Sequence, residues 1–336
     1  MKQPSHLSEK LLQSAFEQDA SDIHFYPQKE ATTIYFRIHG KRSFYQQIKN
    51  PHYNLLLTYF KFTAGMDIGE VRRPQSGTIF HEHSGTSYSL RLSTLPVNQA
   101  ESLAIRILPQ QASLSLDQLF LFPHQYKQIE QWMLHRAGLI LLSGPTGSGK
   151  TTTLYSLLQA IIQKHAFQTI TLEDPIEKTI QDILQVQVNE KAGITYQTGL
   201  KAALRHDPDI IMVGEIRDAQ TAKFALEAAL TGHLVLSTVH AKHTIGTIHR
   251  LKEMGFTTIE LEQSLIGIAS LQLLPVIIGN HSSRRAAIME LLDGTHLELA
   301  LKDTSLNKQQ LSHSFQNLKR KAYAYGFISK HTLQTL

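Results

Sequence analysis

The hydrophobic and polar positions follow different patterns in the two parts of the chain. Up to about residue 109, short segments rich in β-branched and aromatic residues are separated by polar turns, which is typical of strands. The predicted strands are 32–38, 78–80, 87–92 and 102–108, and the apolar spacing of 53–62 predicts a helix between them. Residues 1–109 are therefore predicted to form a small α+β domain.

After a polar stretch at 110–115, which is the predicted linker, the pattern changes. Short and fully apolar segments alternate with helical ones, and this predicts a parallel sheet that is buried on both faces. The predicted strands are 139–142, 169–172, 210–213 and 234–237, and the predicted helices are 152–162, 199–204 and 219–230. From about residue 246 onward the pattern is mostly helical. Residues 116–336 are thus predicted to form an α/β domain with a helical C-terminal part.

Composition limits the kind of protein more than it identifies it. The chain has 336 residues, of which 18% are charged and 42% hydrophobic, so it suits two folded domains. The net charge of +5 is too small to assign a partner. The absence of cysteine excludes disulfides and thiolate metal sites. No apolar run approaches the ~20 residues that span a bilayer, so any membrane association is expected to be peripheral.

A glycine-rich loop between the apolar strand 139–142 and the helix 152–162 matches the phosphate-binding P-loop. The glycines let successive backbone N–H groups point at phosphate oxygens, and the helix places its positive end there. Lys150 is expected to contact the β- and γ-phosphates, and the Thr151 hydroxyl to ligate Mg²⁺. ATP and Mg²⁺ are therefore the predicted cofactors, held at Gly144, Pro145, Thr146, Gly147, Ser148, Gly149, Lys150, Thr151 and Thr152.

Two carboxylates follow predicted strands directly. Glu173 comes after strand 169–172, and Glu215 lies one glycine beyond strand 210–213. Because ligands bind at the carboxyl ends of parallel strands, both side chains are expected to face the P-loop. Asp174 and Asp218, which lie nearby, can equally be caps of the following helices.

Two histidines, His233 and His240, flank the strand 234–237. A histidine at the end of this strand can hydrogen-bond a terminal phosphate or its surrounding carboxylates. Such a residue is, however, more often part of the core or the surface. The sequence leaves both interpretations open.

Taken together, four segments resemble the Walker A, Asp, Walker B and His boxes of the secretion-superfamily ATPases. They are 144–153, 171–177, 206–218 and 231–240, and they come in the family's order. The resemblance implies a RecA-like ATPase domain, with Thr151 and Glu215 on Mg²⁺ and Glu173 as the base that orients water. It also implies a site role for His233 in the His box.

Further segments resemble the small PAS-like N-terminal domain of the same family, namely Ala20 to His24, Phe36 to Gly40 and Arg72 to Gly77. In that family, arginines of this domain approach the nucleotide. The resemblance therefore implies that Arg91 and Arg106, and with less support Arg37, close onto the phosphates. The forked donors of an arginine suit phosphate oxygens, although a strand also exposes arginines routinely.

Within the superfamily, segments 66–75, 93–96 and 186–195 resemble assembly-type motors, and the chain starts almost directly at the PAS-like unit. The combination resembles the competence traffic ATPases of Gram-positive bacteria, which power a pseudopilus for DNA uptake. Many assembly-type relatives carry a four-cysteine zinc module after the His box. Since this chain has no cysteine, no zinc is expected.

The resemblance also implies the partners: a homo-hexamer that acts on an inner-membrane platform protein at the cytoplasmic face of the membrane. Direct nucleic-acid binding is not expected. Three alternatives stay open at this point. The chain can be a pilus retraction motor, a type II secretion ATPase, or a regulatory module that binds nucleotide without turnover.

Overall fold

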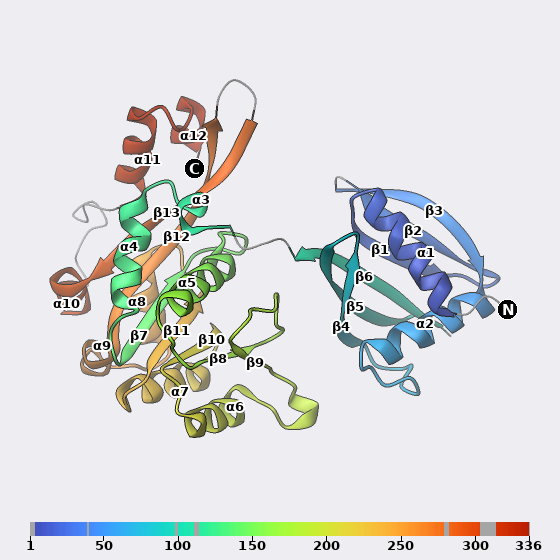
Figure 1. The fold of residues 1–336 in the computed structure, drawn as a ribbon, viewed down its shortest axis with the longest axis horizontal. Coiled ribbons are helices and arrows are strands. Elements are labelled where there is room, and N and C mark those ends of the chain that lie inside the picture. The colour runs from blue at the N-terminus through green and yellow to red at the C-terminus, as the bar shows by residue number, and fades with distance from the viewer. Residues whose placement is uncertain are drawn as a thin grey trace. The chain divides into compact units, whose positions relative to one another are not determined.

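The computed structural model describes residues 4–38, 40–97, 100–110, 114–278, 282–302 and 314–335. The chain divides into two compact units, Met1–Ala112 and Ser113–Leu336 (Figure 1). This division falls inside the predicted linker, 110–115, of which residues 111–113 lie outside the described residues, as does His39 of the predicted PAS-like segment.

The first unit is an antiparallel sheet in the order β3-β2-β1-β6-β5-β4 with helices on one face (Figure 1). Leu11, Leu12 and Phe16 of α1 and Tyr53, Leu56 and Phe60 of α2 pack against alternate residues of the strands. The predicted strands and the predicted helix are all present. The elements are α1 (Pro4–Glu17), β1 (Ala20–Pro27), β2 (Ala31–Ile38), β3 (Lys41–Lys49), α2 (Asn50–Thr63), β4 (Gln75–His83), β5 (Thr86–Val97) and β6 (Ala100–Gln110).

The second unit is built on a sheet in the order β13-β12-β7-β11-β10-β8-β9. Its strands are parallel to their neighbours except for β13, which is antiparallel to β12. The strands are β7 (Gly138–Ser143), β8 (Thr169–Glu173), β9 (Leu184–Gln187), β10 (Ile210–Ile216), β11 (Leu234–Val239), β12 (Leu265–Ile278) and β13 (Ser282–Asp293).

Helices cover both faces of this sheet, as the continuous apolar strands predict. Leu139 and Leu141 of β7 pack into one core with helices α7 to α10, whereas Ile140 and Leu142 pack into the other core with α4 and α5. The helices are α3 (Leu116–Leu119), α4 (Pro123–Trp132), α5 (Lys150–Lys164), α6 (Tyr196–Ala203), α7 (Ala219–Leu230), α8 (Thr244–Glu253), α9 (Thr258–Ser264), α10 (Gly294–Lys302), α11 (Phe315–Ala324) and α12 (Lys330–Thr335), with short 3₁₀ turns at Glu190–Ala192 and Leu204–His206.

The prediction that the chain is mostly helical after residue 246 is wrong for residues 265–278 and 282–293. These two segments form the antiparallel β12–β13 hairpin, and β12 also pairs with β7 next to the P-loop. Apolar residues recur at intervals of three or four (Leu261, Leu265, Ile268, Leu271 and Leu274), which is the spacing of a helix. In the sheet, β12 is instead buried by neighbours that lie far away in the sequence.

Candidate active site

The P-loop connects the end of β7 to the first residue of α5, Lys150. Gly147 and Gly149 have φ angles of 78° and 92°, a region that favours glycine. Gly144 is required for a different reason. A Cβ at this position would lie 2.5 Å from Ser148 Oγ and 2.8 Å from the Leu271 carbonyl oxygen. The loop can therefore adopt its tight path only with glycine.

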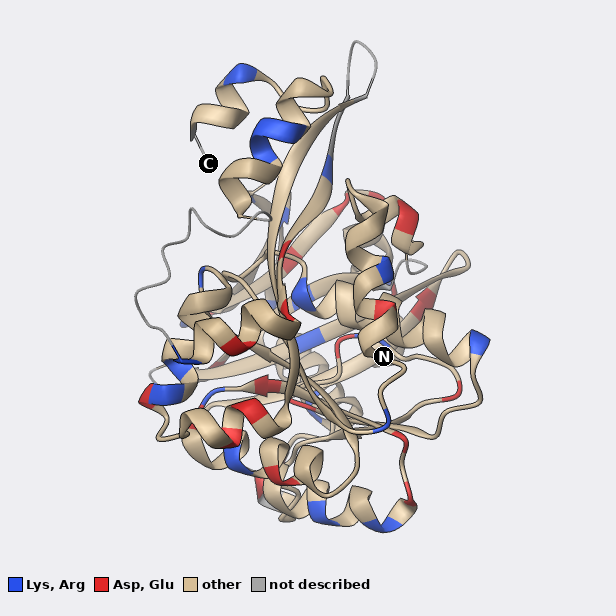
Figure 2. Ribbon diagram, turned by 90° about the vertical axis from the view of Figure 1, so that its left-hand side faces the viewer, with Lys and Arg blue, Asp and Glu red and all other residues tan. Residues whose placement is uncertain are grey.

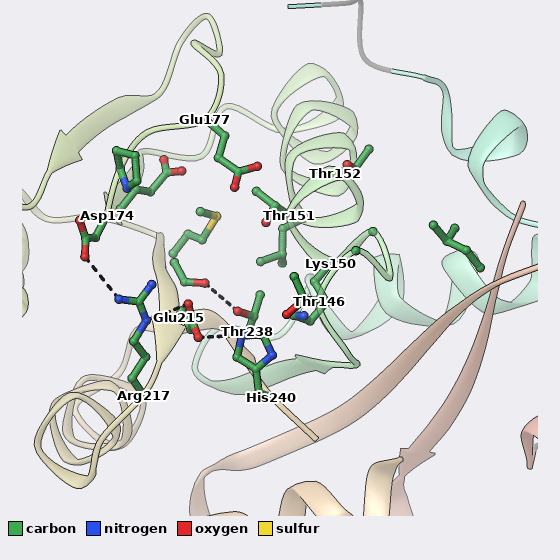
Figure 3. A pocket seen from close by; sticks show the side chains of 18 of the residues that line it. Thr146, Lys150, Thr151, Thr152, Asp174, Glu177, Glu215, Arg217, Thr238 and His240 are labelled. Carbon is green, nitrogen blue, oxygen red and sulfur yellow. Dashed lines mark hydrogen bonds and ion pairs between the residues drawn. The ribbon is translucent and has the colours of Figure 1, made fainter. Parts of the chain in front are cut away.

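A pocket of about 560 Å³ opens beside this loop (Figure 3). The carboxyl ends of β8, β10 and β11 supply most of the opposite wall, as expected for a parallel sheet. Leu273 and Arg285 from the β12–β13 hairpin add a further wall. The polar lining comprises Thr146, Lys150, Thr151, Thr152, Glu173, Asp174, Glu177, Tyr196, Glu215, Arg217, Thr238, His240 and Arg285.

Lys150 is largely buried, and its ammonium donates hydrogen bonds to the carbonyl oxygens of Gly144 at 2.9 Å and Pro145 at 3.1 Å. Burial lowers the pKa of Lys150, and the nearby carboxylates of Glu215 and Glu177 oppose that shift. Beside it, the buried Ser148 Oγ has no hydrogen-bond partner among the described residues. A desolvated cation and an unused hydroxyl at the mouth of the loop fit an anionic oxygen ligand such as phosphate.

Glu173 is 2% exposed, and its carboxylate is held by three donors. One oxygen, Oε1, accepts hydrogen bonds from Thr171 Oγ1 at 2.6 Å and from Gln185 Nε2 at 3.1 Å. The other, Oε2, accepts a hydrogen bond from the Tyr155 hydroxyl. A buried carboxylate needs such hydrogen-bond partners, and together they define the direction in which it points.

Tyr155 connects the helix after the P-loop to the segment that follows β8. Its hydroxyl donates to Glu173, and its oxygen accepts from the backbone N–H of Glu177 at 3.2 Å. Burial, reinforced by the charge of Glu173, raises the pKa of Tyr155, so the hydroxyl keeps its proton and stays a donor. The sequence did not point to Tyr155 or Gln185, because neither belongs to a motif. A tyrosine on a helix and a glutamine on an edge strand are both common.

We expect Tyr155→Phe to lower kcat for ATP hydrolysis by about tenfold or more, since a hydrogen bond to a charged group is lost at the carboxylate. KM for ATP should change little, because Tyr155 does not line the pocket. Steady-state kinetics measure both constants. The matched control is Tyr126→Phe, which removes another tyrosine-to-carboxylate hydrogen bond, to Asp117, from the same unit. Equal effects of the two substitutions on kcat would contradict the interpretation.

Glu215 lies in an ion-pair network at the end of β10. Its Oε2 accepts from Arg217 Nε at 3.0 Å, and its Oε1 lies 2.9 Å from His240 Nε2 (Figure 3). Arg217 also approaches Asp174 at 3.5 Å, and the contact with Glu215 raises the pKa of Arg217. The network links the carboxyl ends of β8, β10 and β11.

Of the two candidate histidines, the structure brings His240 and not His233 to the pocket. His233 precedes β11, and its carbonyl oxygen accepts from the N–H of Gly138 at the start of β7. It therefore lies at the amino edge of the sheet, opposite the P-loop. The placement of His233 beside the nucleotide is corrected to His240, because only the residue after a parallel strand reaches the ligand-binding edge.

Thr151 and Glu215 line the same pocket, as the predicted Mg²⁺ site requires. In the part of the chain that the structure describes, no cluster of three or more histidine or carboxylate side chains could hold a metal by itself. The donor set fits a Mg²⁺ ion that takes its remaining ligands from phosphate oxygens and water.

The candidate arginines of the first unit lie on the sheet face opposite α1 and α2. The strand register places Arg37 and Arg106 directly opposite Asp22, and Arg91 directly opposite Arg106. Arg106 Nε donates to Asp22 Oδ1 at 3.0 Å, and Arg37 lies 3.5 Å from Asp22 Oδ2. Burial raises the pKa of Asp22, but its bonds to Arg106 and Ser21 outweigh this and leave that pKa below its usual range. The structure thus groups Arg37, Arg91 and Arg106 in one row.

Comparison with known proteins shows to which family this chain belongs. Residues 3–321 match the family model described as type II/IV secretion system protein. The chain belongs to that family. It is 41% identical to the competence protein ComGA of Bacillus subtilis over 96% of this chain and 95% of that protein. It is 42% identical to the ComGA protein of Halalkalibacterium halodurans, with 96% of each chain covered.

Longer relatives and solved structures agree with this family. The type IV pilus assembly ATPase PilB of Thermus thermophilus is 40% identical over 79% of this chain, and the matched region covers 30% of PilB. The crystal structure of the pilus retraction motor PilT with bound ADP matches with a TM-score of 0.79 at 28% identity, covering 97% of this chain and 95% of PilT. The Legionella pneumophila ATPase DotB has the same fold, with a TM-score of 0.72 at 22% identity over 98% of this chain and 94% of DotB.

The family confirms the predicted α/β fold of an ATPase domain preceded by a small domain, and the predicted kinship with competence ATPases. The chain is an ATP-hydrolysing enzyme of the type II/IV secretion family. Among the described residues, no helix has the length and apolar character that crossing a membrane demands.

Proposed function

We propose that this chain is the motor that hydrolyses ATP to power assembly of a competence pseudopilus for DNA uptake. The observation that carries the proposal is a pocket that brings the P-loop together with Glu173 and Glu215, in a chain that is more than 40% identical, over nearly its full length, to two competence proteins. The P-loop accounts for nucleotide binding, and the buried Glu173 accounts for turnover.

In this proposal the backbone N–H groups of residues 146–149 bind the phosphates of ATP. Lys150 exchanges its bonds to the loop carbonyls for bonds to the β- and γ-phosphates, which its desolvated ammonium favours. Thr151 and Glu215 would hold Mg²⁺, which supplies positive charge that neutralises the phosphate oxygens. Glu173, oriented by Tyr155 and Gln185, accepts a hydrogen bond from the attacking water and then its proton.

The arginine row of the first unit is proposed as the second half of the site. Arg91 and Arg106 would close onto the phosphates, while Asp22 holds Arg106 in a defined orientation until then. Such a closure lets ATP and ADP bind the open and closed states with different affinity, which is what a motor requires.

The proposed assembly is a homo-hexamer at the cytoplasmic face of the membrane, where it acts on the inner-membrane platform protein. Similarity to the PilB assembly motor and to the PilT retraction motor leaves the direction of movement to experiment.

The test is a strain that lacks this protein and is complemented with either the parent chain or Glu173→Gln. We expect the parent to restore pseudopili and DNA uptake and the variant to restore neither, because the variant binds nucleotide without hydrolysing it. Immunoblots of surface-exposed pilin and transformation frequency measure the two results. Pseudopili that form but fail to retract in the deletion strain would instead favour a retraction motor, and normal pseudopili with lost protein export would favour a secretion ATPase.

A further inference from the structure

The C-terminal part of the second unit differs in charge from the rest of the chain. Residues 304–336 contain no Asp or Glu, and neither do residues 263–289 of the hairpin on which α11 packs. In Figure 2 the helices beside the C-terminus carry blue ribbon segments and no red ones. The positive charge here is therefore not neutralised by neighbouring carboxylates of these segments.

Cations and large apolar side chains are exposed together on this part of the structure. Arg320, Lys321 and Lys330 are exposed. The exposed fractions of Tyr325 and Ile277 are 61% and 51%, and Tyr323 and Phe327 are exposed as well. We call these seven residues the C-terminal basic surface: Ile277, Arg320, Lys321, Tyr323, Tyr325, Phe327 and Lys330.

The core beneath this surface explains why these side chains point outward. Leu318, Ala322 and Ile328 are buried against Leu274 and Ile288 of the hairpin. On α11, Arg320 and Tyr323 lie three residues apart and so share the opposite face. The helix ends at Ala324 with Tyr325 as its C-cap, Gly326 follows with a φ of 74°, and the Phe327 N–H donates to the Ala322 carbonyl at 2.9 Å.

That turn sets Phe327 beside the hairpin, where its carbonyl accepts from the N–H of Ile277 at 2.9 Å. The Tyr325 and Phe327 rings meet edge to face with their centroids 6.0 Å apart, and Lys321 Nζ lies 6.0 Å from the Tyr325 centroid. Ile277, Phe327 and Tyr325 thus follow one another along an apolar ridge, with the ammonium of Lys321 beside Tyr325.

We propose that the C-terminal basic surface binds the headgroup region of a membrane that contains anionic lipid. Lys and Arg near an anionic leaflet gain electrostatic attraction, and Tyr and Phe rings are stable at the boundary between headgroups and acyl chains. An exposed aliphatic residue in the ridge favours lipid over nucleic acid, because Ile277 offers neither a stacking ring nor a phosphate contact. The inference rests on the proposed function only in that this function places the protein at a membrane. Vesicle binding can be measured without ATP hydrolysis, so the two proposals can fail separately.

The experiment is co-flotation of the full chain with vesicles of phosphatidylcholine mixed with phosphatidylglycerol, compared with vesicles of phosphatidylcholine alone. We expect binding to the mixed vesicles only, and weaker binding as salt is added, because screening shortens the reach of surface charges. The double variant Arg320→Gln with Lys330→Gln should bind at least about tenfold more weakly. Tyr325→Ser should also weaken binding, but the dependence of its binding on salt should stay that of the parent, because no charge is removed.

The matched control is Lys201→Gln with Lys223→Gln, which removes the same charge from the exposed surfaces of α6 and α7 and should leave vesicle binding unchanged. Basal ATPase activity and particle mass should be those of the parent in every variant. Equal binding to both vesicle types, or equal loss in the control pair, would overturn the proposal. A smaller particle mass for the Arg320→Gln, Lys330→Gln variant would also overturn it, because the surface would then form contacts between copies of the chain. Binding of the parent to single-stranded DNA but not to vesicles would overturn it as well. Inactive but vesicle-bound parent protein would instead count against the proposed function.

Discussion

Lys150→Ala is expected to reduce ATP hydrolysis by at least about a hundredfold, because a preorganised donor to the transferred phosphoryl group is lost. The effect should be large on kcat and on the affinity for ATP alike, since Lys150 contacts the ligand directly in the proposed complex. Among the described residues, the ammonium donates hydrogen bonds to the carbonyl oxygens of Gly144 and Pro145. The free energy of unfolding should therefore fall by no more than about 1–2 kcal/mol.

The measurement combines steady-state ATPase kinetics, binding of a fluorescent ATP analogue and thermal unfolding. The matched control is Lys164→Ala at the other end of the same helix, where the ammonium bonds Glu130 at 2.6 Å on the surface. That variant should hydrolyse ATP like the parent. Unchanged ATP turnover in Lys150→Ala would contradict the assignment of this pocket as the ATP-binding site.

Glu173→Gln is expected to lower kcat by about 10²–10⁴-fold and to leave ATP binding nearly intact. The substitution keeps the size of the side chain but removes the proton acceptor that the proposed mechanism uses. It also places an amide where Tyr155, Thr171 and Gln185 all point donors, so at least one of these hydrogen bonds is lost. Some loss of stability should therefore accompany the loss of turnover.

Glu290→Gln separates these two effects. Glu290 is also buried and accepts hydrogen bonds from Thr244 and from the Phe315 N–H, but it does not line the pocket. We expect this variant to unfold at a lower temperature and to keep the parent kcat. If Glu173→Gln behaved in the same way, with a lower unfolding temperature and normal turnover, Glu173 would be a structural carboxylate rather than the base.

A double-variant comparison tests whether Tyr155 acts through Glu173. When two residues work on one step, the second substitution adds little to the first. Tyr155→Phe is therefore expected to reduce kcat much less in the Glu173→Gln background than in the parent. Additive effects on kcat would show that the tyrosine contributes by a separate route.

The parts of the site that sequence predicts well are those with local causes. Gly144 to Thr151 is contiguous, and its glycines are required by their φ angles and by the two close contacts at Gly144. Glu173 and Glu215 follow apolar strands directly, and parallel strands bring their carboxyl ends to one edge of the sheet whatever their order. The spacing of apolar residues likewise predicts β7, β8, β10 and β11, because each is buried on both faces.

The errors arise where remote segments decide the structure. The segment that forms β12 looks helical because its apolar residues recur at helical spacing, and only its pairing with β7 and β13 selects the strand. The pairing of β13 with β12 then brings Arg285 to the pocket, more than 100 residues after the P-loop. His233 and His240 cannot be told apart by composition, and the direction of β11 alone makes His240 the residue at the pocket.

The sequence by itself thus indicated the family and placed the P-loop, Glu173 and Glu215 at one edge of the sheet, since short contiguous segments carry these features. Only the tertiary structure decided how Glu173 is oriented, which histidine faces the pocket, and that α11, α12 and the hairpin pack together at the C-terminus. The physical reason is the same in each case. A hydrogen bond or a common surface depends on the distance between side chains, and packing sets that distance between residues far apart in the chain.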